Sequence, residues 1–211
     1  MLQQRAVAPA LLAGLTRLMK DDSLNTFLLV GGTALALQMG HRVSVDIDLF
    51  SKDAFNTQAL AVHLAKHHPF TLTQRTPGFA MGFLNDVKLD LIHHDYPWLA
   101  PPLIVEGIRM ASLLDIAAMK LNAIVDTNQR LKDFVDIVSL STRLSLHQMV
   151  EAYLKKYPAT TLEMAYLSLT WFDGMPTEPF ETLEGTITHE MLTTRILEMV
   201  QRPKQIFPSI V

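Results

Sequence analysis

Residues 27–50 decide the fold of this chain and read Phe-Leu-Leu-Val-Gly-Gly-Thr-Ala-Leu-Ala-Leu-Gln-Met-Gly-His-Arg-Val-Ser-Val-Asp-Ile-Asp-Leu-Phe. The apolar run from Phe27 to Val30 predicts a short buried strand that leads into two glycines. Thr33 to Met39 are good helix formers, and Gly40 is a typical helix stop. Val45 to Phe50 alternates like a second strand. The stretch therefore predicts a strand, a glycine-rich turn, a helix and another strand.

The second predicted strand carries two aspartates. Side chains alternate along a strand, so Asp46 and Asp48 point to one face while Ile47 points into the core. Their Cα atoms would lie roughly 6.6 Å apart. Aspartate is disfavoured in strands, and Mg²⁺ shared with substrate phosphates would explain the pair. An edge strand whose acids simply face solvent is the alternative.

The turn before the helix suits a phosphate. Gly31 and Gly32 would let a phosphate approach backbone N–H groups, and a helix N-terminus favours negative charge. On its own, a glycine pair is also typical of an ordinary tight turn. A P-loop is excluded, because no lysine follows the glycines and their spacing differs. Beside paired carboxylates, the turn predicts a site for a metal-bound nucleoside triphosphate.

A third acid follows in Val87-Lys88-Leu89-Asp90-Leu91-Ile92. The turn signal Asn85-Asp86 lies between two strand-like segments, 79–84 and 87–92, and predicts a β-hairpin. Alternation puts Asp90 on one face with Lys88 and Ile92. As a structural residue Asp90 would be capped or paired. As a third carboxylate it could bind metal and help to deprotonate an attacking hydroxyl.

The remaining pattern predicts an α+β domain over residues 1–110 and an all-helical domain over residues 111–211. The first would add helices over 8–19 and 53–67 and single strands over 70–74 and 103–110. The second would contain helices near 112–125, 131–140, 146–156, 160–172 and 188–201, the first of them capped by Ser112 with Asp115.

Composition narrows the classes further. The chain has 211 residues, of which 49% are hydrophobic and 18% charged, so it should fold. It has no cysteine, which excludes disulfides and thiol catalysis and suits a reducing cytosol. No stretch reaches the about 18 apolar residues of a membrane span, and the start lacks a signal-peptide layout. The net charge of −3 argues against a nonspecific nucleic-acid binder. We expect a cytoplasmic protein without membrane contact.

The ordered set of motifs resembles the polymerase-β-like nucleotidyltransferase superfamily and, more closely, the AbiEii/AbiGii toxin family. Gly31 to Leu37 and His41 to Phe50 carry the resemblance first. Asp115 to Ile124, Arg130 to Asp136 and Thr170 to Pro176 are similar to the family's later segments. The resemblance implies the nucleotidyltransferase-type mixed β-sheet with flanking helices, and a helical domain that closes an active-site cleft.

It also implies roles for particular residues. Mg²⁺ or Mn²⁺ would be bound by three carboxylates, those of Asp46, Asp48 and Asp90. The nucleoside triphosphate would be held by seven residues: Gly31, Gly32, Thr33, Arg42, Ser44, Lys120 and Lys132. The catalytic set would add three residues of the helical domain to the carboxylates: Lys120, Asp133 and Asp136.

The residues of the helical half leave alternatives open. Lys120 is the only charged residue between Asp115 and Asp126, on a helix that is apolar almost all round. A buried lysine needs a partner, and a phosphate would serve, whereas a solvated lysine is the ordinary alternative. Downstream, four residues could equally form a surface ion-pair cluster: Arg130, Lys132, Asp133 and Asp136.

The resemblance implies a toxin of a type IV-like toxin–antitoxin or abortive-infection system. It would transfer NMP from an NTP to an acceptor and release pyrophosphate. The acceptor could be RNA such as the tRNA 3′ end, a protein or a small molecule, with a separate antitoxin as partner. A catalytically inactive nucleotide-binding module is the alternative. Metal-dependent hydrolysis would need more histidine ligands, and for zinc the set His63, His67 and His68 lacks further ligands in sequence.

Overall fold

The computed structural model describes residues 1–127 and 130–211, which divide into two compact units. Met1–Pro97 and Pro101–Ala111 form one, called the α+β unit here. Trp98–Ala100 and Ser112–Val211 form the other, called the helical unit. The predicted fold class, an α+β body followed by a helical half, is confirmed.

The α+β unit is built on a mixed seven-stranded sheet with the order β3-β4-β5-β2-β1-β7-β6. The pairs β2–β5 and β1–β7 are parallel, and the other neighbours are antiparallel. The strands are β1 (Phe27–Leu29), β2 (Ile47–Ser51), β3 (Phe70–Thr76), β4 (Phe79–Leu84), β5 (Val87–His93), β6 (Leu103–Val105) and β7 (Ile108–Met110).

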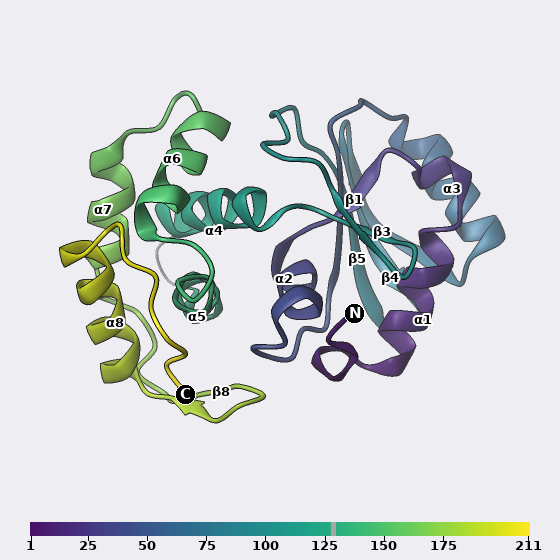
Figure 1. The fold of residues 1–211 in the computed structure, drawn as a ribbon. Helices are drawn as coiled ribbons and strands as arrows, with labels where there is room; N and C mark the ends of the chain where they lie inside the picture. The colour runs from purple at the N-terminus through teal and green to yellow at the C-terminus, as the bar shows by residue number, and fades with distance from the viewer. Residues whose placement is uncertain (128–129) are drawn as a thin grey trace. The chain divides into compact units, whose positions relative to one another are not determined.

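Helices cover both faces of this sheet. Figure 1 shows α2 (Gly31–Met39) on one face and α1 (Pro9–Leu18) and α3 (Thr57–His67) on the other. Alternate residues of the central strands β2 and β5 are fully buried, namely Ile47, Leu49, Leu89 and Leu91. The residues between them therefore point to the other face, which is where Asp48 and Asp90 lie.

Some predicted boundaries need correction. The prediction of one strand over 103–110 is wrong, because Glu106 and Gly107 have φ values of 52° and 80° and turn the chain between β6 and β7. Such a two-residue turn with positive φ is typical of hairpins, but glutamate rarely occupies it. The helix expected from residue 53 begins at Thr57, after an Asn56 side chain that accepts from the Ala59 N–H.

The helical unit is arranged around α4 (Leu113–Thr127), which packs against α5 (Leu131–Leu140), α6 (Leu146–Lys156) and α7 (Leu162–Thr170). A further helix is α8 (His189–Gln201). This half is not exclusively helical, since β8 (Phe180–Glu181) and β9 (Thr186–Ile187) form a small hairpin. In the described part of the chain, no helix has the length and apolar character needed to cross a membrane.

A buried ion pair holds the start of the helical unit together. The predicted cap is present, since the Asp115 N–H donates to Ser112 Oγ. Lys156 Nζ and the Leu99 N–H both donate to Asp115 Oδ1, at 2.9 and 3.0 Å. Burial lowers the pKa of Lys156, and the hydrogen bond and charge of Asp115 act against that shift. The contact with Leu99 explains why the short segment Trp98–Ala100 belongs to this unit.

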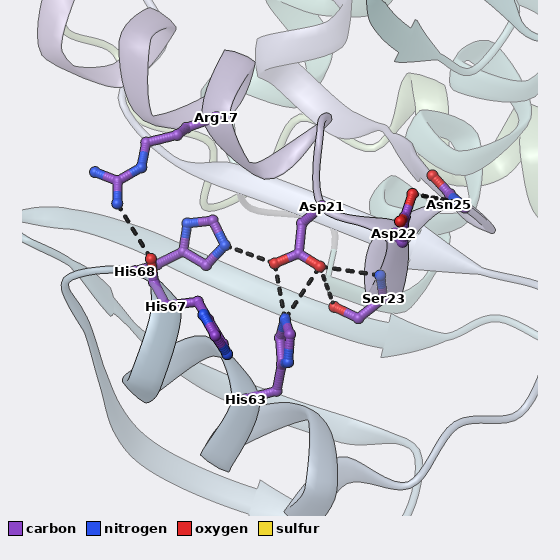
Figure 2. Close-up of polar contacts among 8 residues, drawn as sticks. All are labelled: Arg17, Asp21, Asp22, Ser23, Asn25, His63, His67 and His68. Atoms are coloured by element: carbon purple, nitrogen blue, oxygen red, sulfur yellow. Dashed lines mark hydrogen bonds and ion pairs between the residues drawn. The ribbon is translucent and has the colours of Figure 1, made fainter.

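An aspartate–histidine cluster lies in the α+β unit, between the turn after α1 and the end of α3 (Figure 2). Nε2 of His63 and Nε2 of His68 lie 2.9 and 2.7 Å from Asp21 Oδ2. Ser23 donates to Asp21 Oδ1 through its N–H and its hydroxyl. Burial alone would raise the pKa of Asp21, but the hydrogen bonds from His68, Ser23 and His63 outweigh it and hold the pKa well below its usual range.

Replacing Asp21 by asparagine should destabilise the α+β unit. Asp21→Asn removes the charge that both imidazoles contact, so we expect the free energy of unfolding at pH 7 to fall by about 1–3 kcal/mol. Because the folded pKa of Asp21 is depressed, its stabilisation is present above the unfolded pKa of about 4 and is lost as pH falls through the folded value. In urea unfolding, the difference in free energy of unfolding between the original protein and Asp21→Asn should therefore shrink below about pH 4.

The matched control for this change is Asp22→Asn. Asp22 is exposed, and its carboxylate accepts from the Asn25 side chain at 3.2 Å. We expect this neighbour to change the free energy of unfolding by less than about 0.5 kcal/mol. Equal losses for the two variants would contradict a special role of the cluster.

Candidate active site

The sheet register brings two of the predicted carboxylates together. In the parallel pair β2–β5, Asp48 stands directly opposite Asp90. Neighbouring strands lie about 4.8 Å apart, so both carboxylates share one small area of the sheet face. Asp46 precedes β2 by one residue rather than lying within it. These three residues are called the carboxylate face below.

The glycine turn packs directly against this face. Gly31 has a φ of 66°, and a Cβ atom built there would lie 2.7 Å from Asp48 Oδ2. The Val30 N–H donates to the Asp48 carbonyl oxygen at 2.9 Å. Helix α2 begins at Gly31, and its N-cap residue Val30 supplies no capping side chain. The turn thus joins positive backbone dipoles to the carboxylates, as a site for metal-bound phosphate requires.

The predicted basic and hydroxyl residues lie beside the same turn. A Cβ atom at Gly32 would collide with the Arg42 guanidinium and come within 3.4 Å of Ser44 Oγ. Thr33 Oγ1 contacts Ser44 Oγ at 2.8 Å and the Asp46 carbonyl oxygen. Thr33, Arg42 and Ser44 are all buried. The structure therefore gathers all five predicted nucleotide-binding residues of the α+β unit around the turn.

Lys88 lies beside the carboxylate face, and the sequence assigned it no role there. Lys88 Nζ lies 2.6 Å from Asp90 Oδ2, on the same strand and face. Burial would lower the pKa of Lys88, but the hydrogen bond and charge of Asp90, together with the charges of Asp48 and Asp46, raise it above its ordinary value. The signal was the alternation of β5, which places Lys88 and Asp90 two residues apart on one face.

One carboxylate oxygen of the face is available as a ligand for a cation. Asp90 Oδ1 is buried and, among the described residues, has no hydrogen-bond partner. A buried carboxylate oxygen is costly without a partner, and Mg²⁺ or Mn²⁺ would supply one. Within residues 1–127 and 130–211, no three acidic or histidine side chains already form a metal cage. Mg²⁺ is usually held by one or two carboxylates together with substrate phosphates, so such a cage is not required.

The predicted residues Lys120, Asp133 and Asp136 form a cluster within the helical unit. Lys120 Nζ on α4 lies 2.5 Å from Asp133 Oδ1 and 2.6 Å from Asp136 Oδ2, both on α5. Burial would lower the pKa of Lys120, but the charges and hydrogen bonds of Asp136 and Asp133 raise it. The ammonium therefore stays charged at neutral pH.

Both aspartates of that cluster are buried, with side chains at most 2% exposed. The alternative of a surface ion-pair cluster is therefore wrong for Asp133 and Asp136. Arg130 reaches Asp133 Oδ2 from the surface at 3.4 Å. Lys132 is half-buried on the first turn of α5.

Comparison with known proteins identifies the family. Residues 14–204 match the family model described as nucleotidyl transferase AbiEii toxin, type IV TA system. The chain belongs to the AbiEii family. This membership confirms the resemblance, and it makes the chain a nucleotidyltransferase of a toxin family. The protein aq_aa25 of Aquifex aeolicus strain VF5 is 29% identical over 166 residues, which are 76% of this chain and 80% of that protein.

Solved structures share the fold of this AbiEii member. A putative nucleotidyltransferase from Helicobacter pylori aligns with a TM-score of 0.50 and 16% identity, over 95% of this chain and 96% of that one. JHP933 from Helicobacter pylori aligns with a TM-score of 0.51 and 18% identity, over 92% of this chain and 90% of that one. At such identities the likeness concerns the fold alone.

Adding one methyl group at Gly31 should disturb the carboxylate face. Gly31→Ala puts a carbon against Asp48 Oδ2 and strains a left-handed residue, whereas Gly107→Ala has a similar φ of 80° and nothing within 4 Å. Both variants should lose about 1–2 kcal/mol of folding free energy from backbone strain. Only Gly31→Ala should also weaken Mn²⁺–nucleotide binding, by about tenfold or more in calorimetry. Equal binding by the two variants would contradict the close approach.

Removing the buried lysine should destabilise the helical unit. Lys120→Met leaves Asp133 and Asp136 buried without their cation, which should cost about 3–5 kcal/mol in the free energy of unfolding. Because the folded pKa of Lys120 is raised, its stabilisation is complete below the unfolded pKa of about 10.4 and is lost only as pH rises through the folded value. Lys132→Met, on the half-buried first turn of α5, is the control and should cost less than about 0.5 kcal/mol by thermal unfolding at pH 7.

Proposed function

We propose that this AbiEii member transfers NMP from an NTP to an acceptor in a reaction that depends on Mg²⁺ or Mn²⁺. The observation that carries the proposal is the pairing of Asp48 with Asp90 beside the Gly31 turn. A triphosphate at a helix N-terminus and a divalent ion on paired carboxylates would satisfy both halves of this arrangement. Asp90 Oδ1, which has no hydrogen-bond partner within residues 1–127 and 130–211, supports it.

The predicted site residues of the α+β unit would then have three roles. Asp46, Asp48 and Asp90 would hold the divalent ion, which supplies charge neutralisation to the reacting phosphate. The turn at Gly31 and Gly32 would bind the triphosphate through backbone N–H groups. Three side chains would support the turn and contact phosphate oxygens: Thr33, Arg42 and Ser44.

The chemistry is a single displacement at phosphorus. The acceptor hydroxyl oxygen attacks the α-phosphorus in line, a new P–O bond forms, and the bond to the β-phosphate oxygen breaks. Pyrophosphate leaves with the bonding electrons. Asp90 would help to accept the proton of the hydroxyl.

Residues of the helical unit complete the proposal. Lys120, Lys132, Asp133 and Asp136 would keep the nucleotide-contacting and catalytic roles that the family resemblance implies. The two ion pairs of Lys120 would hold its ammonium in one place and keep it charged. A fixed charge needs little reorganisation when the reaction begins, which is favourable for transition-state stabilisation.

The acceptor we propose is RNA, with the 3′ end of tRNA as the leading candidate, which is the acceptor that the family resemblance implies. A protein hydroxyl and a small molecule are the alternative acceptors. A type IV toxin–antitoxin system implies a separately encoded antitoxin as partner. The absence of cysteine from the sequence suits action in the cytoplasm.

Label transfer tests the proposal directly. The protein is incubated with each α-³²P NTP, Mg²⁺ and total RNA, and the RNA, protein and small-molecule fractions are separated. We expect label in one fraction, most of all in tRNA, and release of pyrophosphate. Asp48→Asn should reduce the rate by at least about 100-fold, because the ion loses a carboxylate ligand.

Asp86→Asn is the matched control, since Asp86 lies exposed in the turn between β4 and β5. Its rate should equal that of the original protein. Absence of label from every fraction would refute the transfer reaction, and tight nucleotide binding without transfer would instead favour an inactive nucleotide-binding module. Equal rates for Asp48→Asn and Asp86→Asn would show that the carboxylate face is not the active site.

A further inference from the structure

Lys88 forms a direct ion pair with the carboxylate face, through Asp90. We propose that Lys88 is a positioning residue that orients Asp90 and competes with bare divalent metal, so that the ion binds well only together with the nucleotide's phosphates. This inference rests on the proposed function, because it concerns the same metal site. Nothing in the family match assigns a role to this lysine.

The contact itself constrains Asp90. Lys88 Nζ binds Asp90 Oδ2 at 2.6 Å, while Asp90 Oδ1 is buried and has no hydrogen-bond partner among the described residues. One carboxylate oxygen is therefore fixed by an ammonium and the other is left for a second cation. The Asp90 side chain is 13% exposed, so it is largely withdrawn from water. An ion pair with one buried partner is stronger than one at the surface.

On the side of β4, no charged residue stands opposite Lys88 or Asp90. On β4 the residues paired with Lys88 and Asp90 are Phe83 and Met81, which carry no charge. On the side of β2 the partner of Asp90 is Asp48, and Asp46 lies just before that strand. The ammonium thus faces three carboxylates. Without it, the negative charges would repel one another across about 5–7 Å.

This arrangement has a consequence for metal binding. A divalent ion at Asp90 would lie within a few ångströms of the lysine ammonium, and the two cations repel each other. The phosphates of an NTP bring negative charge that offsets this repulsion. The Lys88 side chain is 37% exposed and has a flexible stem, so it can move from Asp90 towards those phosphates. Metal and nucleotide would therefore bind cooperatively.

Binding of Mn²⁺ alone, followed by the EPR signal of the unbound ion, tests this inference without using activity. Lys88→Met should bind Mn²⁺ about tenfold more tightly than the original protein, as expected for removing one positive charge near a divalent ion. Lys88→Arg keeps the charge and should bind as the original does. Lys66→Met removes a charge from α3, on the other face of the sheet, and should leave the affinity unchanged.

A second titration adds a nonhydrolysable NTP. In the original protein the nucleotide should tighten Mn²⁺ binding strongly, and in Lys88→Met this gain should shrink by about the same tenfold. Circular dichroism checks that each variant is folded. A merely structural role for Lys88 predicts equal or weaker Mn²⁺ binding by Lys88→Met, and that result would overturn the inference.

Asp48→Asn separates this inference from the proposed function. If Asp48→Asn loses Mn²⁺ while Lys88→Met binds it no more tightly than the original protein, the carboxylate site stands and the role of Lys88 falls. If Asp48→Asn binds Mn²⁺ as well as the original protein, the ion lies elsewhere and the proposed metal site fails together with the inference.

Discussion

Electrostatic repulsion between carboxylates on one face of a sheet is the constraint on which the α+β unit depends. The parallel register of β2 and β5 sets Asp48 opposite Asp90. Nearby residues accommodate each of these two aspartates. Glycine at position 31 removes the side chain that would strike Asp48. Lys88 neutralises one oxygen of Asp90, and the other oxygen has no hydrogen-bond partner in the described part of the chain. The residual negative charge is what a metal-bound triphosphate would balance.

In the helical unit, the buried lysines are paired with buried aspartates. Lys120 is matched by Asp133 and Asp136, and Lys156 is matched by Asp115, all with side chains at most 8% exposed. Pairs of this kind add little net stability compared with apolar packing, but breaking one leaves an uncompensated charge in the interior. They therefore fix helix positions more than they stabilise them. Among the described residues, Asp133 Oδ2 resembles Asp90 Oδ1 in being buried without a hydrogen-bond partner, although Arg130 approaches it to 3.4 Å.

Local patterns predicted most of the elements because strands, hairpins and caps depend on nearby residues. Strand alternation predicted the shared face of Asp46 and Asp48, and the spacing of Ser112 to Asp115 predicted a helix cap. Long-range pairings were not predictable in this way. Nothing near Asp21 in sequence indicates that His63 and His68 fold against it. The two partners of Lys120 lie on another helix, and the turn at Glu106 uses a residue that seldom adopts positive φ. The residues themselves predicted the glycine turn and the carboxylates, and the family resemblance added the roles of Arg42, Ser44 and the helical residues. Alternation put Lys88 on the face of Asp90, but only the structure shows their ion pair.

The position of Mn²⁺ in crystals grown with a nonhydrolysable NTP would show whether Asp48 and Asp90 bind the metal, because anomalous scattering locates the ion without reference to activity. We expect an anomalous peak within about 2.3 Å of carboxylate oxygens of Asp48 and Asp90 and of the nucleotide's phosphates, with the triphosphate against the Gly31 turn. A peak at Asp21, His63 and His68, or a triphosphate bound away from the turn, would contradict it.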